Sequence, residues 1–135
     1  MAAAALLACS PLSLAQLSTY NLTGSAVDLG DNCFQLTPNF NTQVGTVWAN
    51  EILDLEEPFH LQALMNFGNN DVNGADGIVF VLQDVGPDAQ GSSGGGLGFS
   101  GFQPSFGVEF DTWDNPDNGD LTADHIGMIS DGSAA

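Results

Sequence analysis

Crowded carboxylates are the feature that most limits what this chain can fold into. Six Asp and Glu residues lie in the segment VEFDTWDNPDNGDLTADHIG, Val108 to Gly127, and the chain contains neither Lys nor Arg to neutralise them. Carboxylates brought this close together repel one another and raise each other's pKa values when water is removed. The segment is therefore either a solvated acidic loop or a site at which a bound cation supplies the missing positive charge.

Charge and length exclude several classes of function. The chain has 135 residues and a formal net charge of -17. That charge repels phosphate backbones, so we expect no binding to nucleic acid. Without Lys and Arg there is also no Schiff-base chemistry and no P-loop lysine. The length suits a single domain, and an apolar content of 43% is enough for a hydrophobic core.

The first residues, MAAAALLACSPLSLA, have the composition of a secretory signal. Their apolar run ends in Ser-Leu-Ala, a small-residue cleavage site, which predicts a signal peptide over residues 1–15 and a secreted or cell-surface protein. The missing basic n-region favours a start upstream of Met1, and a lipoprotein cleavage box before Cys9 is an alternative. The run is too short to span a bilayer, so no membrane insertion is expected. If Cys9 is removed with the signal peptide, Cys33 is either a buried thiol or forms a disulfide with a cysteine outside this chain.

Short apolar or alternating runs between turn residues predict an all-β protein. The expected strands are Tyr20–Ala26, Cys33–Leu36, Thr46–Ala49, Phe59–Met65, Gly77–Leu82, Phe106–Asp111 and His125–Ile129. Their spacing suits an antiparallel β-sandwich. The stretch GSSGGGLG, Gly91–Gly98, is too rich in glycine for a strand interior. It predicts a loop whose backbone can approach a ligand closely.

The spacing of the acidic segment favours the metal-binding alternative. Alternate side chains of a strand share a face, so Glu109, Asp111 and Trp113 would point the same way. The series continues in steps of two, five and five through Asn115, Asp120 and His125. Oxygen-rich turns suit hard cations such as calcium, and one imidazole among carboxylates shifts the preference toward a transition metal such as manganese. The segment lacks the glycine and glutamate spacing of an EF-hand.

The same series resembles the metal ligands of the legume-type (L-type) lectins, the concanavalin A-like family with bacterial members. In those lectins the ligands run Glu, Asp, aromatic, Asn, Asp and His at the spacing found here, and the flanking words VEFDTW and HIGM resemble the family's EFDTF and HIGI. The resemblance implies Mn²⁺ held by Glu109, Asp111, Asp120 and His125. It also implies Ca²⁺ held by Asp111, the backbone carbonyl of Trp113, Asn115 and Asp120.

A second segment, GADGIVFVLQ at residues 74–83, resembles the ADGLAFFL strand of the same lectins. The resemblance implies that Asp76 accepts hydrogen bonds from sugar hydroxyls. It also implies that the Ala75–Asp76 peptide is cis. In the same reading, Asn115 donates its amide N–H to the sugar and Trp113 presents its ring to an apolar face of the pyranose.

A third segment, GGGLGF at residues 94–99, resembles the GGYLGVF loop, in which a glycine N–H donates to the sugar. Gly95 or Gly96 would take that role, and the choice is open because the loop here is one residue shorter. Together the three segments imply a jelly-roll β-sandwich whose metal-organised site binds sugar hydroxyls. The resemblance also implies that the protein is not an enzyme.

The resemblance also implies partners and organisation. The expected partners are glycans or glycoconjugates, and weak single sites favour a longer multidomain or multivalent protein. L-type lectin domains are longer than this chain. Residues 16–135 would therefore be the N-terminal part of one, with a sandwich that is incomplete at the C-terminus.

Two other functions remain open. The pattern E-x-D-x-x-D, Glu109 to Asp114, resembles the catalytic strand of a glycoside hydrolase family with the same architecture. There Glu109 would be the nucleophile and Asp114 the acid/base of a retaining mechanism. Asp114 is one methylene shorter than the residue of that family, and Asp76, Asn115 and His125 would have no role. The second alternative is a surface adhesion module that keeps the fold without binding sugar.

Overall fold

The computed structural model describes residues 6–7, 19–70 and 72–133, and these residues form an all-β protein. Its strands are β1 (Leu6–Leu7), β2 (Tyr20–Gly24), β3 (Val27–Gly30), β4 (Cys33–Gln35), β5 (Gly45–Ala49), β6 (Met65–Asn66), β7 (Gly77–Gln83), β8 (Ser105–Asp111) and β9 (His125–Ser130). Two short 3₁₀ turns, η1 (Gly94–Gly96) and η2 (Pro116–Asn118), complete the elements. Within the described ranges, no helix has the length and apolarity needed to cross a membrane.

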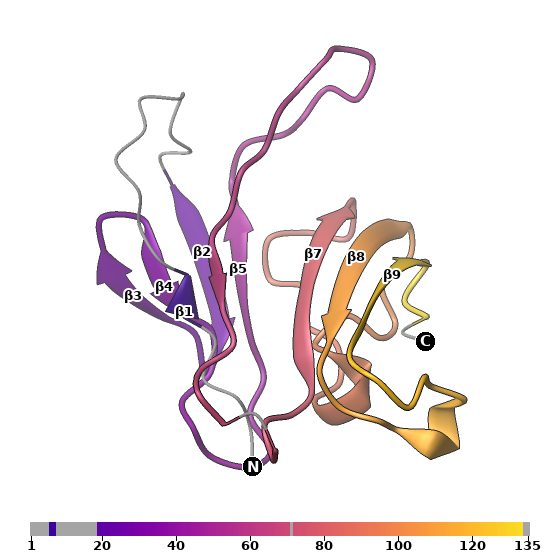
Figure 1. Ribbon diagram of the computed structural model, residues 1–135. Coiled ribbons are helices and arrows are strands. Elements are labelled where there is room, and N and C mark those ends of the chain that lie inside the picture. Colours follow the sequence, from indigo (N-terminus) through magenta and orange to yellow (C-terminus); the bar gives the residue numbers. More distant parts are fainter. Residues whose placement is uncertain (1–5, 8–18, 71, 134–135) are drawn as a thin grey trace.

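The strands pair antiparallel in three sheets. One sheet has the order β3-β4-β1-β6, a second is the β2-β5 pair, and the third has the order β7-β8-β9. Figure 1 shows the β7-β8-β9 sheet on one side of the molecule and the other two sheets on the opposite side. The antiparallel all-β fold expected from the sequence is confirmed.

The β7-β8-β9 sheet follows the period-two pattern of its sequence. Ile78, Phe110 and Ile126 are register partners, and so are Val79, Glu109 and Gly127 one step along. Because successive side chains point to opposite faces, the first trio lies on one face and the second trio on the other. The sheet thus has one largely apolar face and one face that carries the acids of the β8 end.

A small core lies on the acid-bearing side of this sheet. It consists of Ala89, Phe99, Phe102 and Ile129, with Trp48 of β5 packed against them. The Trp48 indole N–H donates to the carbonyl of Ala89 at 2.7 Å, which satisfies its one donor inside a partly buried site. This contact joins the β2-β5 pair to the loop that follows β7.

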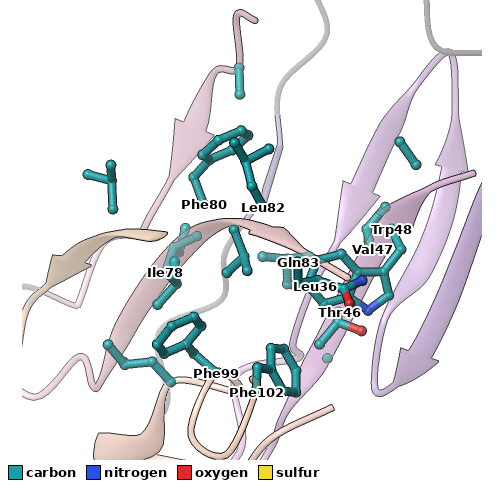
Figure 2. Close-up of a pocket in the computed structure, with 18 of the residues that line it drawn as sticks. Leu36, Thr46, Val47, Trp48, Ile78, Phe80, Leu82, Gln83, Phe99 and Phe102 are labelled. Atoms are coloured by element: carbon teal, nitrogen blue, oxygen red, sulfur yellow. The ribbon is translucent and has the colours of Figure 1, made fainter. Parts of the chain in front are cut away.

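A broad cleft of about 2600 Å³ opens between β5 and β7. In Figure 2, Phe80 and Leu82 lie on one side of the β7 ribbon and Phe99 and Phe102 on the other. The cleft is lined by apolar side chains from all three sheets, including Phe34 of β4, Trp48 of β5 and Phe80 of β7. Several large apolar side chains of β8 and β9 are also exposed, namely Phe106, Ile126 and Met128.

One strand prediction is wrong. Phe59–Met65 was expected to be a strand, but only Met65 belongs to one, the two-residue β6. Phe59 and Leu64 are 48% and 54% exposed, and the segment belongs to the long arm between β5 and β6 that projects from the body in Figure 1. Alternating apolar residues form a strand where a neighbouring edge accepts their backbone hydrogen bonds, and such pairing begins here only at β6.

The remaining strand predictions hold with shifted ends. The expected Tyr20–Ala26 strand ends at Gly24, whose φ of +61° turns the chain, and β3 follows as a strand the sequence pattern did not indicate. The glycine-rich stretch is a loop containing η1, as expected. Apart from Leu6 and Leu7, the predicted signal peptide lies outside the described residues, as does Cys9.

Candidate functional site

Two buried carboxylates define the candidate site. Glu109 and Asp111 lie on the same face of β8, and their residues are 1% and 3% exposed. Asp111 is paired in register with His125, the first residue of β9. Acids this deeply buried are uncommon unless they are paired or bind a metal, so their surroundings decide what the site can do.

The imidazole of His125 lies between two carboxylates. Its Nε2 is 3.6 Å from Glu109 Oε1 and 3.5 Å from Asp120 Oδ1. Its Nδ1 is 3.2 Å from the carbonyl oxygen of Ala123, and a proton on Nδ1 donated to that carbonyl leaves the Nε2 lone pair directed at the acids. This is how metal-binding histidines are commonly oriented. One ligand atom each from Asp111, Asp120 and His125 lies within 4.8 Å of the others.

Three buried oxygens at the site have no hydrogen-bond partner. They are both carboxylate oxygens of Glu109 and the side-chain Oδ1 of Asn115. A buried acceptor without a partner is costly, and the chain has no Lys or Arg to supply one. The oxygens together with one imidazole nitrogen form a donor set that suits a divalent cation with mixed nitrogen and oxygen ligands. The residues therefore fit a divalent cation, the kind of ion expected from the sequence.

Burial also changes the acidity of the site. Desolvation is the main cause that raises the pKa of Asp111 from its ordinary value of 3.8 to about 6. The neighbouring Asp120 carboxylate contributes to this rise, against the lowering effect of the Trp113 N–H. A raised carboxyl pKa is the response expected where like charges are brought together without a cation.

Carboxylates also shape the loop between β8 and β9. Asp111 Oδ1 accepts the backbone N–H of Trp113 at 2.7 Å. Asp120 Oδ2 accepts the N–H of Asn115 at 3.0 Å, and its Oδ1 accepts the N–H of Leu121 at 2.7 Å. The expected ligands are thus brought to one end of the sheet by hydrogen bonds within the loop itself.

Asp76 immediately precedes β7 at the same end of the sheet. The Ala75–Asp76 peptide is cis, as the resemblance implied. The carbonyl oxygen of Asp76 accepts both the backbone N–H of Thr112 at 2.8 Å and the Thr112 hydroxyl at 3.2 Å. Its carboxylate Oδ1 lies 3.5 Å from Asn115 Nδ2. The structure therefore places Asp76 next to the acidic loop, although the two are more than thirty residues apart.

The glycine loop and the loop that carries Trp113 lie at the same end of the β7-β8-β9 sheet. In Figure 1, the salmon turn that contains η1 and the yellow turn that contains η2 lie at the end of the sheet where β7 begins and β8 ends. Trp113 is 40% exposed. A Cβ on Gly96 would overlap the Ser92 hydroxyl, so any other residue here would have to displace that side chain. The N–H groups of Leu97 and Gly98 are used within the loop.

Sequence reasoning missed Gly127 and Thr112. Gly127 of β9 is paired with Glu109, and a Cβ there would overlap Glu109 Oε1. The Glu109 carboxylate can therefore lie over β9 only because this residue is glycine. Gly127 lies within the motif HIGM. A glycine inside a strand pattern often marks a close approach, and this was the sequence signal that could have identified it. No sequence signal pointed to Thr112, because its hydrogen bond to Asp76 depends on how β7 and β8 pair.

The two acids of the hydrolase alternative lie in different surroundings. Glu109 is buried within β8, whereas Asp114 lies beyond the strand end and is exposed. Glu109 Oε1 is adjacent to the His125 ring instead. The arrangement does not favour a pair of carboxyls on either side of a glycosidic bond, as retaining hydrolysis requires.

Comparison with known protein families gives a match over most of the chain. Residues 13–134 match the family model described as the legume lectin beta-barrel domain. The matched range includes all of the expected metal ligands, Asp76 and the glycine loop.

Proposed function

The chain belongs to the L-type (legume) lectin family, and from that premise we propose that it binds carbohydrate at a site organised by calcium and manganese. The family as a whole supports carbohydrate binding and is generally non-enzymatic. We propose accordingly that this protein is a lectin and not an enzyme, and that its partners are glycans or glycoconjugates outside the cell or on its surface.

The single observation that carries the metal proposal is the set of buried acceptors without partners around Glu109 and Asn115. Manganese would be held by Glu109, Asp111, Asp120 and His125. Calcium would be held by Asp111, the Trp113 carbonyl, Asn115 and Asp120. When bound, the cations neutralise these carboxylates and hold the loop between β8 and β9 in one conformation.

The sugar would be bound by side chains beside this loop. Asp76 would accept hydrogen bonds from two hydroxyl groups, and charge-assisted bonds of this kind are stronger than neutral ones. Asn115, whose Nδ2 lies 3.5 Å from Asp76 Oδ1, would donate to a hydroxyl beside the same acid. Trp113, which is 40% exposed, would cover an apolar face of the pyranose, and Gly95 or Gly96 would donate a backbone N–H.

Neutral sugars are well hydrated, so each lost water contact must be replaced. A single shallow site of this kind binds weakly. We propose that useful affinity comes from several sites acting together, either in one longer protein or in an assembly, because linked sites bind at a high effective concentration.

Binding to a glycan array, with and without Ca²⁺ and Mn²⁺, tests the proposal. We expect retention on a subset of glycans, loss of that retention in chelator, and recovery when both cations are restored. Asp76→Asn should abolish retention while leaving the cations bound in equilibrium dialysis. A protein that retains neither cation in dialysis would overturn the metal proposal, and metal-loaded protein that binds no glycan would favour the adhesion-module alternative.

A further inference from the structure

The loop that follows β7 is fastened to β2 by side-chain hydrogen bonds. Its residues 87–90, which we call the strap, lie immediately before the glycine loop. The side-chain amide of Asn21 in β2 donates to the carbonyl oxygen of Pro87 at 2.6 Å and to Asp88 Oδ1 at 2.7 Å. Both N–H bonds of that amide are thus used, and Asn21 holds two successive residues of the strap.

Thr23 holds the end of the strap next to the glycine loop. Its hydroxyl donates to Gln90 Oε1 at 2.7 Å and lies 2.7 Å from the hydroxyl of Thr46 on β5. Because Asn21 and Thr23 are alternate residues of one strand, they project from the same face. A Cβ on Gly24 would overlap Gln90 Oε1, so a larger residue there would displace the side chain that Thr23 holds.

The partner strand β5 holds the middle of the strap. Trp48 is the register partner of Asn21, and its indole N–H donates to the carbonyl oxygen of Ala89 at 2.7 Å. Ala89 belongs to the buried core. The β2-β5 pair thus fixes three successive parts of the strap, and none of these contacts involves an expected metal ligand.

The strap leads directly into the base of the glycine loop. Two backbone hydrogen bonds close that base, from the Gly91 N–H to the Gly98 carbonyl and from the Gly98 N–H to the Ser92 carbonyl, each 2.8 Å long. A Cβ on Gly91 would overlap backbone atoms of Ser100, so the base also packs closely against the chain that follows the loop. Because Gln90 and Gly91 are adjacent, a displacement of the strap would move the base of the glycine loop.

We propose that Asn21 and Thr23 are positioning residues for carbohydrate binding, which hold the strap and thereby set where the glycine loop presents its backbone N–H groups. This inference rests on the proposed role of Gly95 or Gly96 in binding the sugar. The anchor lies on β2 and β5, whereas the expected cation ligands lie on β8, β9 and the loop between them. Loosening the anchor should therefore weaken carbohydrate binding and not cation binding, since a loop that is no longer held in place loses more conformational freedom when the sugar binds.

Substitutions at Thr23 test the anchor in the full chain. Thr23→Val keeps the shape of the side chain and removes its hydroxyl, and Thr23→Ser restores a hydroxyl. Asn50→Ala is the control, because it removes a side-chain hydrogen bond that links the ends of the same two strands through Thr19 and does not reach the strap. Affinities would be measured by calorimetry for Ca²⁺, for Mn²⁺ and, with both cations present, for the methyl glycosides of mannose, glucose, galactose and N-acetylglucosamine.

We expect Thr23→Val to weaken glycoside binding about three- to tenfold, the effect of one lost hydrogen bond, with both cation affinities unchanged. Thr23→Ser should recover most of the loss, and Asn50→Ala should match the unmodified chain. A matching loss of cation affinity in Thr23→Val would overturn the proposal, because Thr23 would then support the fold as a whole. Unchanged glycoside affinity in Thr23→Val, or a loss that Thr23→Ser does not recover, would overturn it as well.

The pair of Asn21 and Asp88 tests the other end of the anchor. Asn21→Asp places a second carboxylate where an amide now donates to Asp88 at 2.7 Å, so glycoside affinity should fall about tenfold. Adding Asp88→Asn returns a donor to the pair and should recover part of that loss, because the hydrogen bond to Pro87 stays broken. Equal glycoside affinities in the single and double variants would overturn the positioning role of Asn21.

Amide hydrogen exchange tests the anchor even if the chain binds none of the four glycosides. With both cations present, Thr23→Val should speed exchange of the Gly91 and Gly98 N–H groups, which close the base of the loop, while Thr23→Ser should not. Equal exchange in the unmodified chain and both variants would overturn the positioning role. If no glycoside binds and exchange is still faster in Thr23→Val, the proposed carbohydrate site fails while the anchoring of the loop stands.

Discussion

The two faces of the β7-β8-β9 sheet each depart from the usual pattern of folded proteins, in which acidic residues are exposed and large apolar residues are buried. On one face the acidic residue Glu109 is only 1% exposed, whereas on the other the apolar residue Met128 is 76% exposed. Buried charges and exposed apolar patches are the two observations that carry information beyond ordinary folding. Here both arise from a single period-two pattern in the same three strands.

The comparison teaches that the two faces carry different kinds of information. On the acid-bearing face, the chemistry of the missing partner can be named, because unpartnered oxygens beside an imidazole suit a divalent cation. On the apolar face, Phe106, Ile126 and Met128 indicate only that apolar surface is accessible. Predictions about function therefore belong to the first face, and predictions about solubility belong to the second.

The largest effect is expected from neutralising Glu109. In the unmodified chain, cations at about a hundred times their dissociation constant should raise the free energy of unfolding by about 2.7 kcal/mol. Glu109→Gln should lose this gain, yet in chelator it should be at least as stable as the unmodified chain, because burying a neutral amide costs less than burying a carboxylate. Thermal denaturation with Ca²⁺ and Mn²⁺ or with chelator measures both effects.

The exposed Asp114 provides the matched control for that experiment. Asp114→Asn removes a carboxylate from the same segment but not from the proposed ligand set, so the cation-dependent rise in melting temperature should remain. If the cations raise the melting temperature of Glu109→Gln as much as that of the unmodified chain, the buried acid does not bind them. That result would remove the main distinction between the two faces.

The next largest effect is expected at Gly127. In Gly127→Ala the new Cβ would overlap Glu109 Oε1 and displace the carboxylate, so cation affinity should fall about 10- to 100-fold, the range found for residues that orient metal ligands. Met128→Ala changes the adjacent residue on the opposite face and should leave cation affinity unchanged. Equilibrium dialysis measures the cation affinities of the two variants, whose substitutions are adjacent in sequence but lie on opposite faces of the sheet. Equal cation affinities in the two variants would show that the Glu109 carboxylate can move without weakening cation binding.

How much could be predicted depended on whether the relevant contacts are local in sequence. The series from Glu109 to His125 belongs to one strand–loop–strand unit, so spacing alone could indicate that its members converge, and the structure brings Asp111, Asp120 and His125 together. The antiparallel all-β fold was likewise visible from the alternation of apolar residues.

Contacts between strands were harder to predict. Asp76 could be placed near the loop only through the resemblance to known lectins, and the hydrogen bonds from Thr112 could not be foreseen, because they depend on the β7-β8 register. The error at Phe59–Met65 has the same origin, since the alternation predicts a strand without showing which edge would pair with it.

A smaller effect is expected on the apolar face. Replacing Ile126 and Met128, which are 70% and 76% exposed, by Thr keeps the β-propensity of the strand and removes apolar surface that favours association. The free energy of unfolding should change by no more than about 0.5 kcal/mol, while light scattering should show less self-association. Cation affinity should not change. A large loss of stability in this double variant would mean that the face is covered in solution.

A further effect is expected from pH and concerns Asp111. Burial and the neighbouring Asp120 raise the pKa of this carboxyl from 3.8 to about 6 in the metal-free protein. Its neutral form therefore favours the folded state. That contribution is complete below the unfolded value of 3.8 and is lost as pH rises through about 6.

Cation binding should have the opposite dependence on pH, because a bound cation requires the ionised carboxylate. Affinity for Ca²⁺ and Mn²⁺ should fall as the pH drops below about 6, and binding at about pH 5 should release a proton to the buffer. Calorimetry in two buffers of different ionisation enthalpy measures that proton directly. The same titration of Met128→Ala should be unaltered. If no proton is released, Asp111 is already ionised before the cation arrives, and crowding on the acid-bearing face does not perturb it.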